Sequence, residues 1–178
     1  MSNLFESLIA RPLAEKMRPT RLELLVGQEH LLAPDAPLGR MLRERRASSM
    51  ILWGPPGSGK TTLAKIIAEH VNMNFVSLSA VFSGVSDLRR VFDKAIERKK
   101  IGEETLLFVD EIHRFNRAQQ DSFLPFVEDG TVVLVGATTE NPSFELNSAL
   151  LSRCKVFILE KIARAGLEHL VKRAEKLE

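Results

Sequence analysis

The chain has 178 residues, of which 44% are hydrophobic and 27% are charged, an ordinary balance for one globular domain. The formal net charge of +2 is close to neutral, so charge alone demands no nucleic-acid partner. The single cysteine, Cys154, excludes an internal disulfide and a cysteine-based zinc cluster. The sequence shows neither a targeting signal nor a run long enough to span a membrane, so we expect a cytoplasmic protein without a membrane partner.

Five short apolar runs predict strands, and helical patterns lie between them. The runs have the length and the β-branched or aromatic content of strands, and they cover residues 50–53, 74–78, 105–109, 132–136 and 155–159. Strands that alternate with helices predict an α/β fold, here a five-stranded parallel sheet flanked by helices. One of the helical patterns has apolar residues at steps of three and four, which predicts a buried face made of Leu88, Val91, Phe92, Ala95 and Ile96.

A phosphate-binding loop is predicted where residues 54–61 read G-P-P-G-S-G-K-T, between the first strand and a helix. Glycines in this pattern let consecutive backbone N–H groups face inward, and the following helix adds its positive end. Lys60 would reach the β and γ phosphates, and the Thr61 hydroxyl would ligate Mg²⁺. The predicted nucleotide-binding residues of the loop are Gly54, Pro55, Pro56, Gly57, Ser58, Gly59, Lys60, Thr61 and Thr62.

Two carboxylates follow the third predicted strand, at the edge of the sheet where ligands bind in parallel α/β proteins. Asp110 would hold the magnesium through water. Glu111 is one residue further on and points elsewhere, so it can polarise the water that attacks the γ-phosphate. The adjacent acids indicate hydrolysis of the nucleotide rather than binding alone.

Two further segments lie where nucleotide chemistry would need them. Residues 137–142 read A-T-T-E-N-P after the fourth strand, and a hydroxyl there could orient the attacking water. Arg153 lies between a helical stretch and the last strand. An arginine in this place either pairs with phosphate or forms a surface salt bridge, and its position alone leaves both open.

These segments, in this order, resemble an AAA+ ATPase of the clamp-loader and Holliday-junction-motor branch. More closely, the stretch from Asp110 to Arg153, beginning D-E-I-H-R-F and including G-A-T-T-E-N-P, resembles the replication-associated recombination protein A family, whose eukaryotic relative is the Werner-helicase-interacting ATPase. The amino-terminal segment P-L-A-E-K-M-R-P-T-R-L-E-L-L-V-G-Q-E-H-L-L fits the same family. The resemblance therefore covers nearly the whole chain.

The resemblance implies more than the spacing of residues shows. It implies the sheet order 5-1-4-3-2, ATP and Mg²⁺ as ligands, and an adenine site near Val26 and Gly27. It also implies that Thr139 is the sensor 1 residue, or Thr138 if the strand ends a residue earlier. Arg153 would act as an arginine finger on the nucleotide of a neighbouring subunit, which completes a catalytic set with Glu111, Lys60 and Thr139.

The expected domains are an AAA+ ATPase domain with an amino-terminal extension at 1–160, and the beginning of a truncated helical lid at 161–178. The lid segment has Leu167, Leu170, Val171 and Ala174 on one face. Family members continue into a lid with a sensor 2 arginine and an oligomerisation domain, so we expect the lid to be largely missing here. This chain would then be mainly monomeric and slow in hydrolysis, and the full-length protein a homo-oligomer.

Three functions fit these observations. The favoured one is a DNA-dependent ATPase of replication-fork maintenance and recombination, located at the bacterial nucleoid, which meets single-stranded DNA, ends or forks and the single-strand-binding protein. The second is a clamp-loader-type assembly module that is gated by nucleotide. The third is a small-molecule kinase, which would need a substrate pocket and lid that the sequence does not show. No Asn-Lys-x-Asp stretch is present to read guanine, so ATP is the expected nucleotide.

Overall fold

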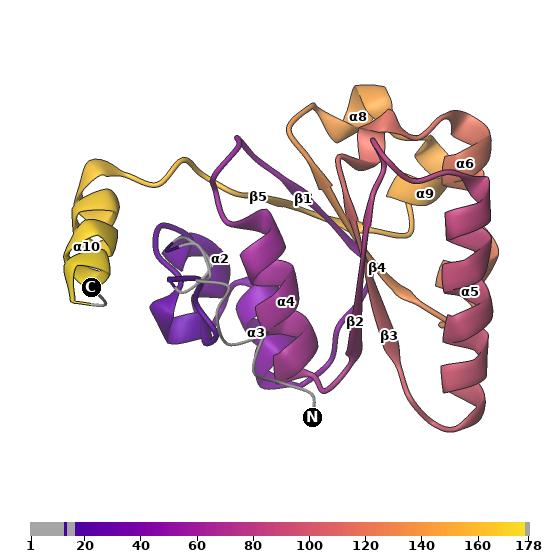
Figure 1. The fold of residues 1–178 in the computed structure, drawn as a ribbon, viewed down its shortest axis with the longest axis horizontal. Helices are drawn as coiled ribbons and strands as arrows, with labels where there is room; N and C mark the ends of the chain where they lie inside the picture. The colour runs from indigo at the N-terminus through magenta and orange to yellow at the C-terminus, as the bar shows by residue number, and fades with distance from the viewer. Residues whose placement is uncertain (1–12, 14–16, 177–178) are drawn as a thin grey trace, which may run out of the picture.

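The computed structural model describes residue 13 and residues 17–176 (Figure 1). Most of the predicted amino-terminal extension, residues 1–12 and 14–16, lies outside the described residues, as do the last two residues of the chain. Within the described part, strands and helices alternate as the sequence predicts. No helix in this part is both long and apolar enough to cross a membrane.

A parallel sheet of five strands forms the centre of the fold. The strands are β1 (Met50–Trp53), β2 (Asn74–Ser79), β3 (Thr105–Asp110), β4 (Val133–Thr138) and β5 (Lys155–Ile158). Their order is β2-β3-β4-β1-β5, which confirms the expected order 5-1-4-3-2. The prediction for the fourth strand was wrong at both ends, because it covered 132–136. The strand continues to 138 since Leu52 and Trp53 of β1 pair with Ala137 and Thr138.

The strands supply two hydrophobic cores, one on each face of the sheet, because successive side chains of a strand point to opposite faces. Met50 and Leu52 of β1 lie in the core beneath α4 (Lys60–His70), whereas Ile51 lies in the core beneath α5 (Val85–Lys100). β3 divides in the same way: Leu106 and Phe108 face the first core, and Leu107 and Val109 face the second. This burial on both faces explains the continuous apolar runs of the sequence.

The helices cover the two faces unequally (Figure 1). The face of α4 is also covered by α3 and α2, and the opposite face is covered by α5 and the short helices that follow it. The α-helices are α2 (Glu29–Leu32), α3 (Pro37–Arg43), α4 (Lys60–His70), α5 (Val85–Lys100), α6 (Arg117–Asp121), α7 (Leu124–Glu128), α8 (Pro142–Glu145), α9 (Ser148–Leu151) and α10 (Arg164–Glu175). Two 3-10 turns, η2 (Leu22–Leu24) and η3 (Ile112–Arg114), complete the described elements.

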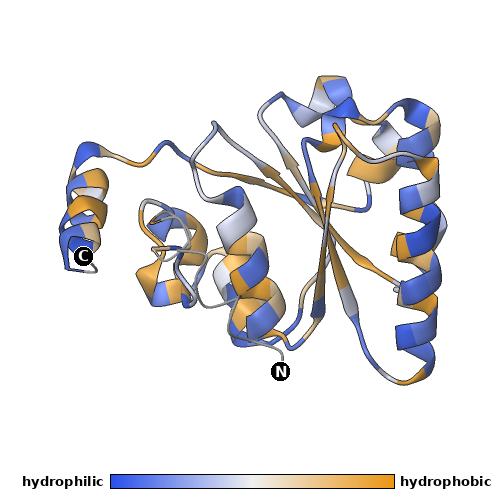
Figure 2. Ribbon diagram, viewed as in Figure 1, coloured by the Kyte–Doolittle hydropathy of each residue, from blue (hydrophilic) through white to orange (hydrophobic). Residues whose placement is uncertain are grey.

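Helix α5 has the buried apolar face that the sequence predicts. Leu88, Phe92 and Ala95 are buried, and Phe92 stacks on Phe126 with ring centroids 4.0 Å apart. The other side of the helix is polar, as its hydropathy colours show (Figure 2). The side chain of Asp87 accepts a hydrogen bond from the backbone N–H of Gly84 at 2.9 Å, which fixes the start of the helix.

Helix α10 follows β5 after an extended segment and stands beside the sheet rather than on it (Figure 1). Its predicted apolar face is only partly covered, because Leu167 is 48% exposed and Val171 is 57% exposed. Gly166 approaches Val26 so closely that a Cβ on it would lie 2.7 Å from Val26 Cγ1. The helix therefore packs on the segment before α2.

The chain crosses itself closely where β1 ends. Leu159 donates its backbone N–H to the Trp53 carbonyl at 2.7 Å, which places Leu159 against Gly54. A Cβ on Gly54 would lie 2.6 Å from the Leu159 carbonyl oxygen. Backbone rather than a movable side chain would be displaced, so this position requires glycine.

We predict that Gly54→Ala lowers the free energy of unfolding by about 1–3 kcal/mol, the usual cost of forcing atoms into a filled site. Denaturant titration measures this loss. Gly84→Ser is the control, because a Cβ there meets no atom within 4 Å and serine is a good helix-capping residue. Equal stability of the Gly54 variant and the unmodified chain would contradict the close approach.

Candidate functional site

The loop between β1 and α4 has the backbone shape of a phosphate cradle. Gly57 and Gly59 adopt positive φ angles of 76° and 95°, in the left-handed region where glycine is strongly favoured. Helix α4 begins directly after Gly59, so its first N–H groups and its positive end face the loop. Among the described residues, the buried Ser58 hydroxyl has no hydrogen-bond partner, which an anion in the loop could supply.

The Lys60 ammonium is held inside this loop. Its side chain donates hydrogen bonds to the carbonyl oxygens of Gly54 at 2.7 Å and Pro55 at 2.9 Å. Burial lowers the pKa of Lys60, and the charges of Glu111 and Asp110 oppose that shift. The loop carbonyls thus fix the cation at the place where phosphate oxygens would meet it.

The acidic pair leaves the end of β3 with an unusual backbone. Glu111 has φ 52° and ψ 45°, a left-handed conformation that is rare for residues other than glycine and is often found at functional sites. Its N–H donates to the Asp110 carboxylate at 3.1 Å. The turn directs the two carboxylates differently, as the sequence predicts for adjacent acids with separate roles.

Thr138, the last residue of β4, and Thr139, the residue after it, have different surroundings. Thr139 lines the cavity and donates a long hydrogen bond of 3.5 Å to the Glu111 carboxylate. Thr138 is fully buried, and its hydroxyl contacts His113 Nδ1 at 2.8 Å. Of these two threonines, Thr139 lines the cavity and Thr138, the last residue of β4, does not.

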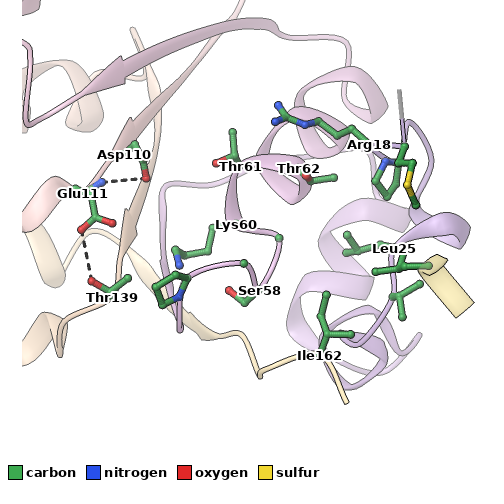
Figure 3. A pocket seen from close by; sticks show the side chains of 17 residues that line it. Arg18, Leu25, Ser58, Lys60, Thr61, Thr62, Asp110, Glu111, Thr139 and Ile162 are labelled. Carbon is green, nitrogen blue, oxygen red and sulfur yellow. Dashed lines mark hydrogen bonds between the residues drawn. The ribbon is translucent and has the colours of Figure 1, made fainter. Parts of the chain in front are cut away.

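A cavity of about 620 Å³ joins these parts (Figure 3). Asp110, Glu111 and Thr139 lie on one side of the phosphate loop, and Leu25 and Ile162 lie on the other (Figure 3). The cavity thus has a charged end for phosphates and an apolar end for a base. Its lining comprises Met17, Arg18, Pro19, Leu25, Val26, Pro56, Gly57, Ser58, Gly59, Lys60, Thr61, Thr62, Asp110, Glu111, Thr139, Ile162 and Leu170.

Three predicted nucleotide-binding residues do not line the cavity. Gly54 and Pro55 are the first two residues of the loop, and their carbonyls accept hydrogen bonds from Lys60. Gly27 packs against Ile162, since a Cβ on it would lie 3.3 Å from Ile162 Cγ1. The sequence missed the contributions of residues 17–19 and of the segment after β5, because no motif marks them.

The donor set fits magnesium bound together with a nucleotide. Thr61 and Asp110 both line the cavity, and hydroxyl and carboxylate oxygens are the ligands that Mg²⁺ prefers. Within residues 13 and 17–176, no group of three or more His, Cys, Asp or Glu side chains could hold a metal alone. A magnesium ion bound with a nucleotide takes its other ligands from phosphates and water.

Arg153 does not reach the cavity of its own chain. It lies in the turn between α9 and β5, where its guanidinium pairs with the Glu128 carboxylate and donates to the Ala149 carbonyl at 2.7 Å. The structure therefore shows the salt-bridge alternative within this chain. Such a partly exposed ion pair is worth about 0–1 kcal/mol, so the arginine could exchange this partner at small cost.

Gln28 connects the phosphate loop to the segment after β5, a role that no pattern in the sequence predicts. Its fully buried side chain donates to the carbonyls of Ser58 at 3.1 Å and Glu160 at 2.8 Å. Its oxygen accepts the Glu160 N–H at 3.1 Å. One side chain thus fixes both the loop and the start of the connection to α10.

The family of the chain follows from comparison of this fold and site with known proteins. The model of the ATPase family associated with various cellular activities (AAA) matches residues 50–161, which is more than half of the chain. The chain therefore belongs to the AAA family. The match includes the phosphate loop, the acidic pair and both threonines of the β4 end.

Individual relatives agree with the resemblance seen in the sequence. Replication-associated recombination protein A of Escherichia coli is 51% identical over 177 residues, which are 98% of this chain and 40% of that protein. ATPase WRNIP1 of Dictyostelium discoideum is 55% identical over 162 residues, 91% of this chain and 18% of that protein. The resemblance to the replication-associated recombination protein A family is thereby confirmed. The chain spans less than half the length of these relatives.

A solved structure confirms the fold class. The Thermotoga maritima RuvB Holliday junction branch migration motor matches 90% of this chain and 54% of its own, with a TM-score of 0.73 and 33% sequence identity. The chain thus has the P-loop AAA architecture of that motor.

We predict that Gln28→Ala destabilises the chain by on the order of 1–3 kcal/mol for each buried group left unpaired, and weakens nucleotide binding because the loop loses an anchor. Thermal unfolding and a nucleotide titration measure both effects. His30→Ala is the control, because its bond to the Ile158 carbonyl is exposed and water can replace it. Equal effects of the two variants would show that Gln28 is not an anchor.

Proposed function

We propose that this chain is the ATP-binding and ATP-hydrolysing domain of a longer DNA-dependent ATPase. The observation that carries the proposal is the placement of Asp110, Glu111 and Thr139 opposite the phosphate loop in one cavity. A binding module would need the loop alone. A carboxylate base beside the phosphate end is what hydrolysis adds.

The residues divide the reaction between them. The loop N–H groups and Lys60 hold the β and γ phosphates, and Glu111 accepts a proton from the water whose oxygen attacks the γ-phosphorus. The bond between the γ-phosphorus and the bridging oxygen breaks, and ADP and phosphate leave. Thr139 orients the water or the γ-phosphate. Mg²⁺, held through Thr61 and Asp110, would neutralise charge on the phosphates.

The base of the nucleotide would occupy the apolar end of the cavity. Val26 and Ile162 line this end together with Leu170 of α10. The wall therefore comes from two segments that are far apart in the sequence, one before β1 and one after β5. We take residues 1–160 as the ATPase domain and 161–178 as the beginning of a helical lid, since Leu170 already covers the cavity.

The cellular role rests on the relatives. They carry the name replication-associated recombination protein A, and the solved neighbour is a branch migration motor. This favours a role in replication-fork maintenance and recombination over a clamp-loader-type assembly module. We propose that the full-length protein is a homo-oligomer at the bacterial nucleoid, that it acts on single-stranded DNA, ends or forks, and that it meets the single-strand-binding protein.

Glu111→Gln in the full-length protein should lower ATP hydrolysis about 10²- to 10⁴-fold, because the proton acceptor is lost, while nucleotide affinity is kept. Lys60→Ala should instead weaken ATP binding about 10- to 100-fold, the equivalent of a charged hydrogen bond. Phosphate release and equilibrium nucleotide binding separate the two effects. Unchanged turnover of the Glu111 variant would remove this carboxylate from the mechanism.

We propose that Arg153 acts as an arginine finger, which contacts the nucleotide bound to a neighbouring subunit. Arg153→Ala in the full-length protein should lower turnover by up to about 10³- to 10⁵-fold and spare nucleotide binding. Mixing this variant with Glu111→Gln should restore part of the activity, because some interfaces then contain one intact base and one intact arginine. We expect the 178-residue chain alone to be mainly monomeric and slow. Fast hydrolysis by this chain, independent of its concentration, would contradict the role in trans.

A further inference from the structure

His113 contacts both the acidic pair and the end of β4, although no motif of the sequence assigns it a role. It lies in η3, two residues after Glu111, and its side chain is only 9% exposed. Its ring nitrogen Nε2 is 3.2 Å from Glu111 Oε2, and Nδ1 is 2.8 Å from Thr138 Oγ1. Both ring nitrogens are therefore used.

Two arrangements of hydrogens fit these contacts, because the Thr138 hydroxyl also lies 3.2 Å from the Glu140 carbonyl oxygen and can donate there. An ionised carboxylate can only accept, so in both arrangements Nε2 of His113 carries a hydrogen beside Glu111 Oε2. In the neutral ring Nδ1 accepts the hydroxyl hydrogen of Thr138, and in the protonated ring Nδ1 donates to that hydroxyl. The Thr138 hydroxyl is itself fixed, because it accepts the Glu140 backbone N–H at 3.0 Å. The end of β4 thus orients the imidazole, and the imidazole orients the carboxylate.

The two carboxylate oxygens of Glu111 differ in their side-chain contacts. In the described part of the chain, the side-chain contacts of this carboxylate with His113 and Thr139 both fall on Oε2. The contact from Thr139 is the longer one, at 3.5 Å. His113 is therefore the closer partner, and Oε1 is the oxygen that remains to accept a proton from water.

We propose that His113 is a positioning residue for the water-activating carboxylate: it holds Glu111 Oε2 and thereby directs Oε1 to the attacking water. The inference deepens the proposed ATPase function and depends on it. His113 links Glu111 to Thr138, the neighbour of the proposed sensor Thr139, so the base and the sensor are fixed to the same rigid strand end. A misplacement of about 1 Å at a reacting group can cost 10²-fold in rate.

Three variants of the full-length protein separate positioning from packing. In His113→Gln the side-chain amide can place a donor where Nε2 of the histidine was. In His113→Asn the shorter amide reaches only the former position of Nδ1. His113→Phe keeps the volume of the ring but forms no hydrogen bonds. We expect the hydrolysis rate at saturating ATP to fall about 10²-fold in the Phe and Asn variants and less than about tenfold in the Gln variant. The dissociation constant for ATP should change by less than about threefold in all three.

The comparison of the Gln and Asn variants tests whether His113 positions Glu111, even if the Phe variant fails to fold. Equal rates in these two variants, or a loss of ATP affinity that matches the loss of rate, would overturn the positioning role. Glu111→Gln, measured in parallel, tests the proposed function separately. If Glu111→Gln is inactive while all His113 variants keep the unmodified rate, the ATPase mechanism stands and the inference about His113 is wrong. If Glu111→Gln keeps full activity, both are wrong.

Discussion

Parallel pairing of β1 with β4 is the constraint on which the site depends. Trp53 pairs with Thr138, and Gly54 extends the register by donating its N–H to the Thr138 carbonyl at 3.1 Å. The phosphate loop therefore begins beside the strand end that carries Thr139. Because β3 pairs with β4 on the other side, Asp110 and Glu111 reach the same edge. Strand pairing thus brings the phosphate loop, the acidic pair and Thr139 to one edge of the sheet.

The opposite wall of the cavity depends on a second constraint, the polar connection through Gln28. This side chain holds the carbonyls of Ser58 and Glu160, so the phosphate loop and the segment after β5 are fixed to one another. Leu159 strengthens the same crossing through its bond to Trp53. A nucleotide bound in the cavity would consequently contact a wall that is mechanically tied to α10. This arrangement physically connects the phosphate loop to the segment that leads into α10.

The parts of the fold that the sequence predicts are those that depend on local pattern. Strand positions follow from apolar runs buried on both faces, and the loop follows from glycines that need positive φ at Gly57 and Gly59. The choice between Thr138 and Thr139 was open, because side chains alternate along a strand and a shift of one residue exchanges their faces. Pairing with β1 determines where β4 ends, and that pairing is not local.

Contacts between distant residues of ordinary polar type could not be predicted from one sequence. The sequence around Gln28 and His113 would look the same if these side chains were exposed. Only the folded chain brings each of them to its partners. Arg153 shows the converse case. Its two possible roles were evident from its position, and the structure provides Glu128 as its partner within the chain.

We propose that the cavity between the phosphate loop and the β3 and β4 ends binds magnesium and ATP. A crystal structure of the chain with Mg²⁺ and a non-hydrolysable ATP analogue would show this binding. The triphosphate should lie on the N–H groups of residues 57–62, the metal between Thr61 and Asp110, and the base against Val26 and Ile162. Phosphates bound elsewhere, or a metal held away from Thr61 and Asp110, would contradict it.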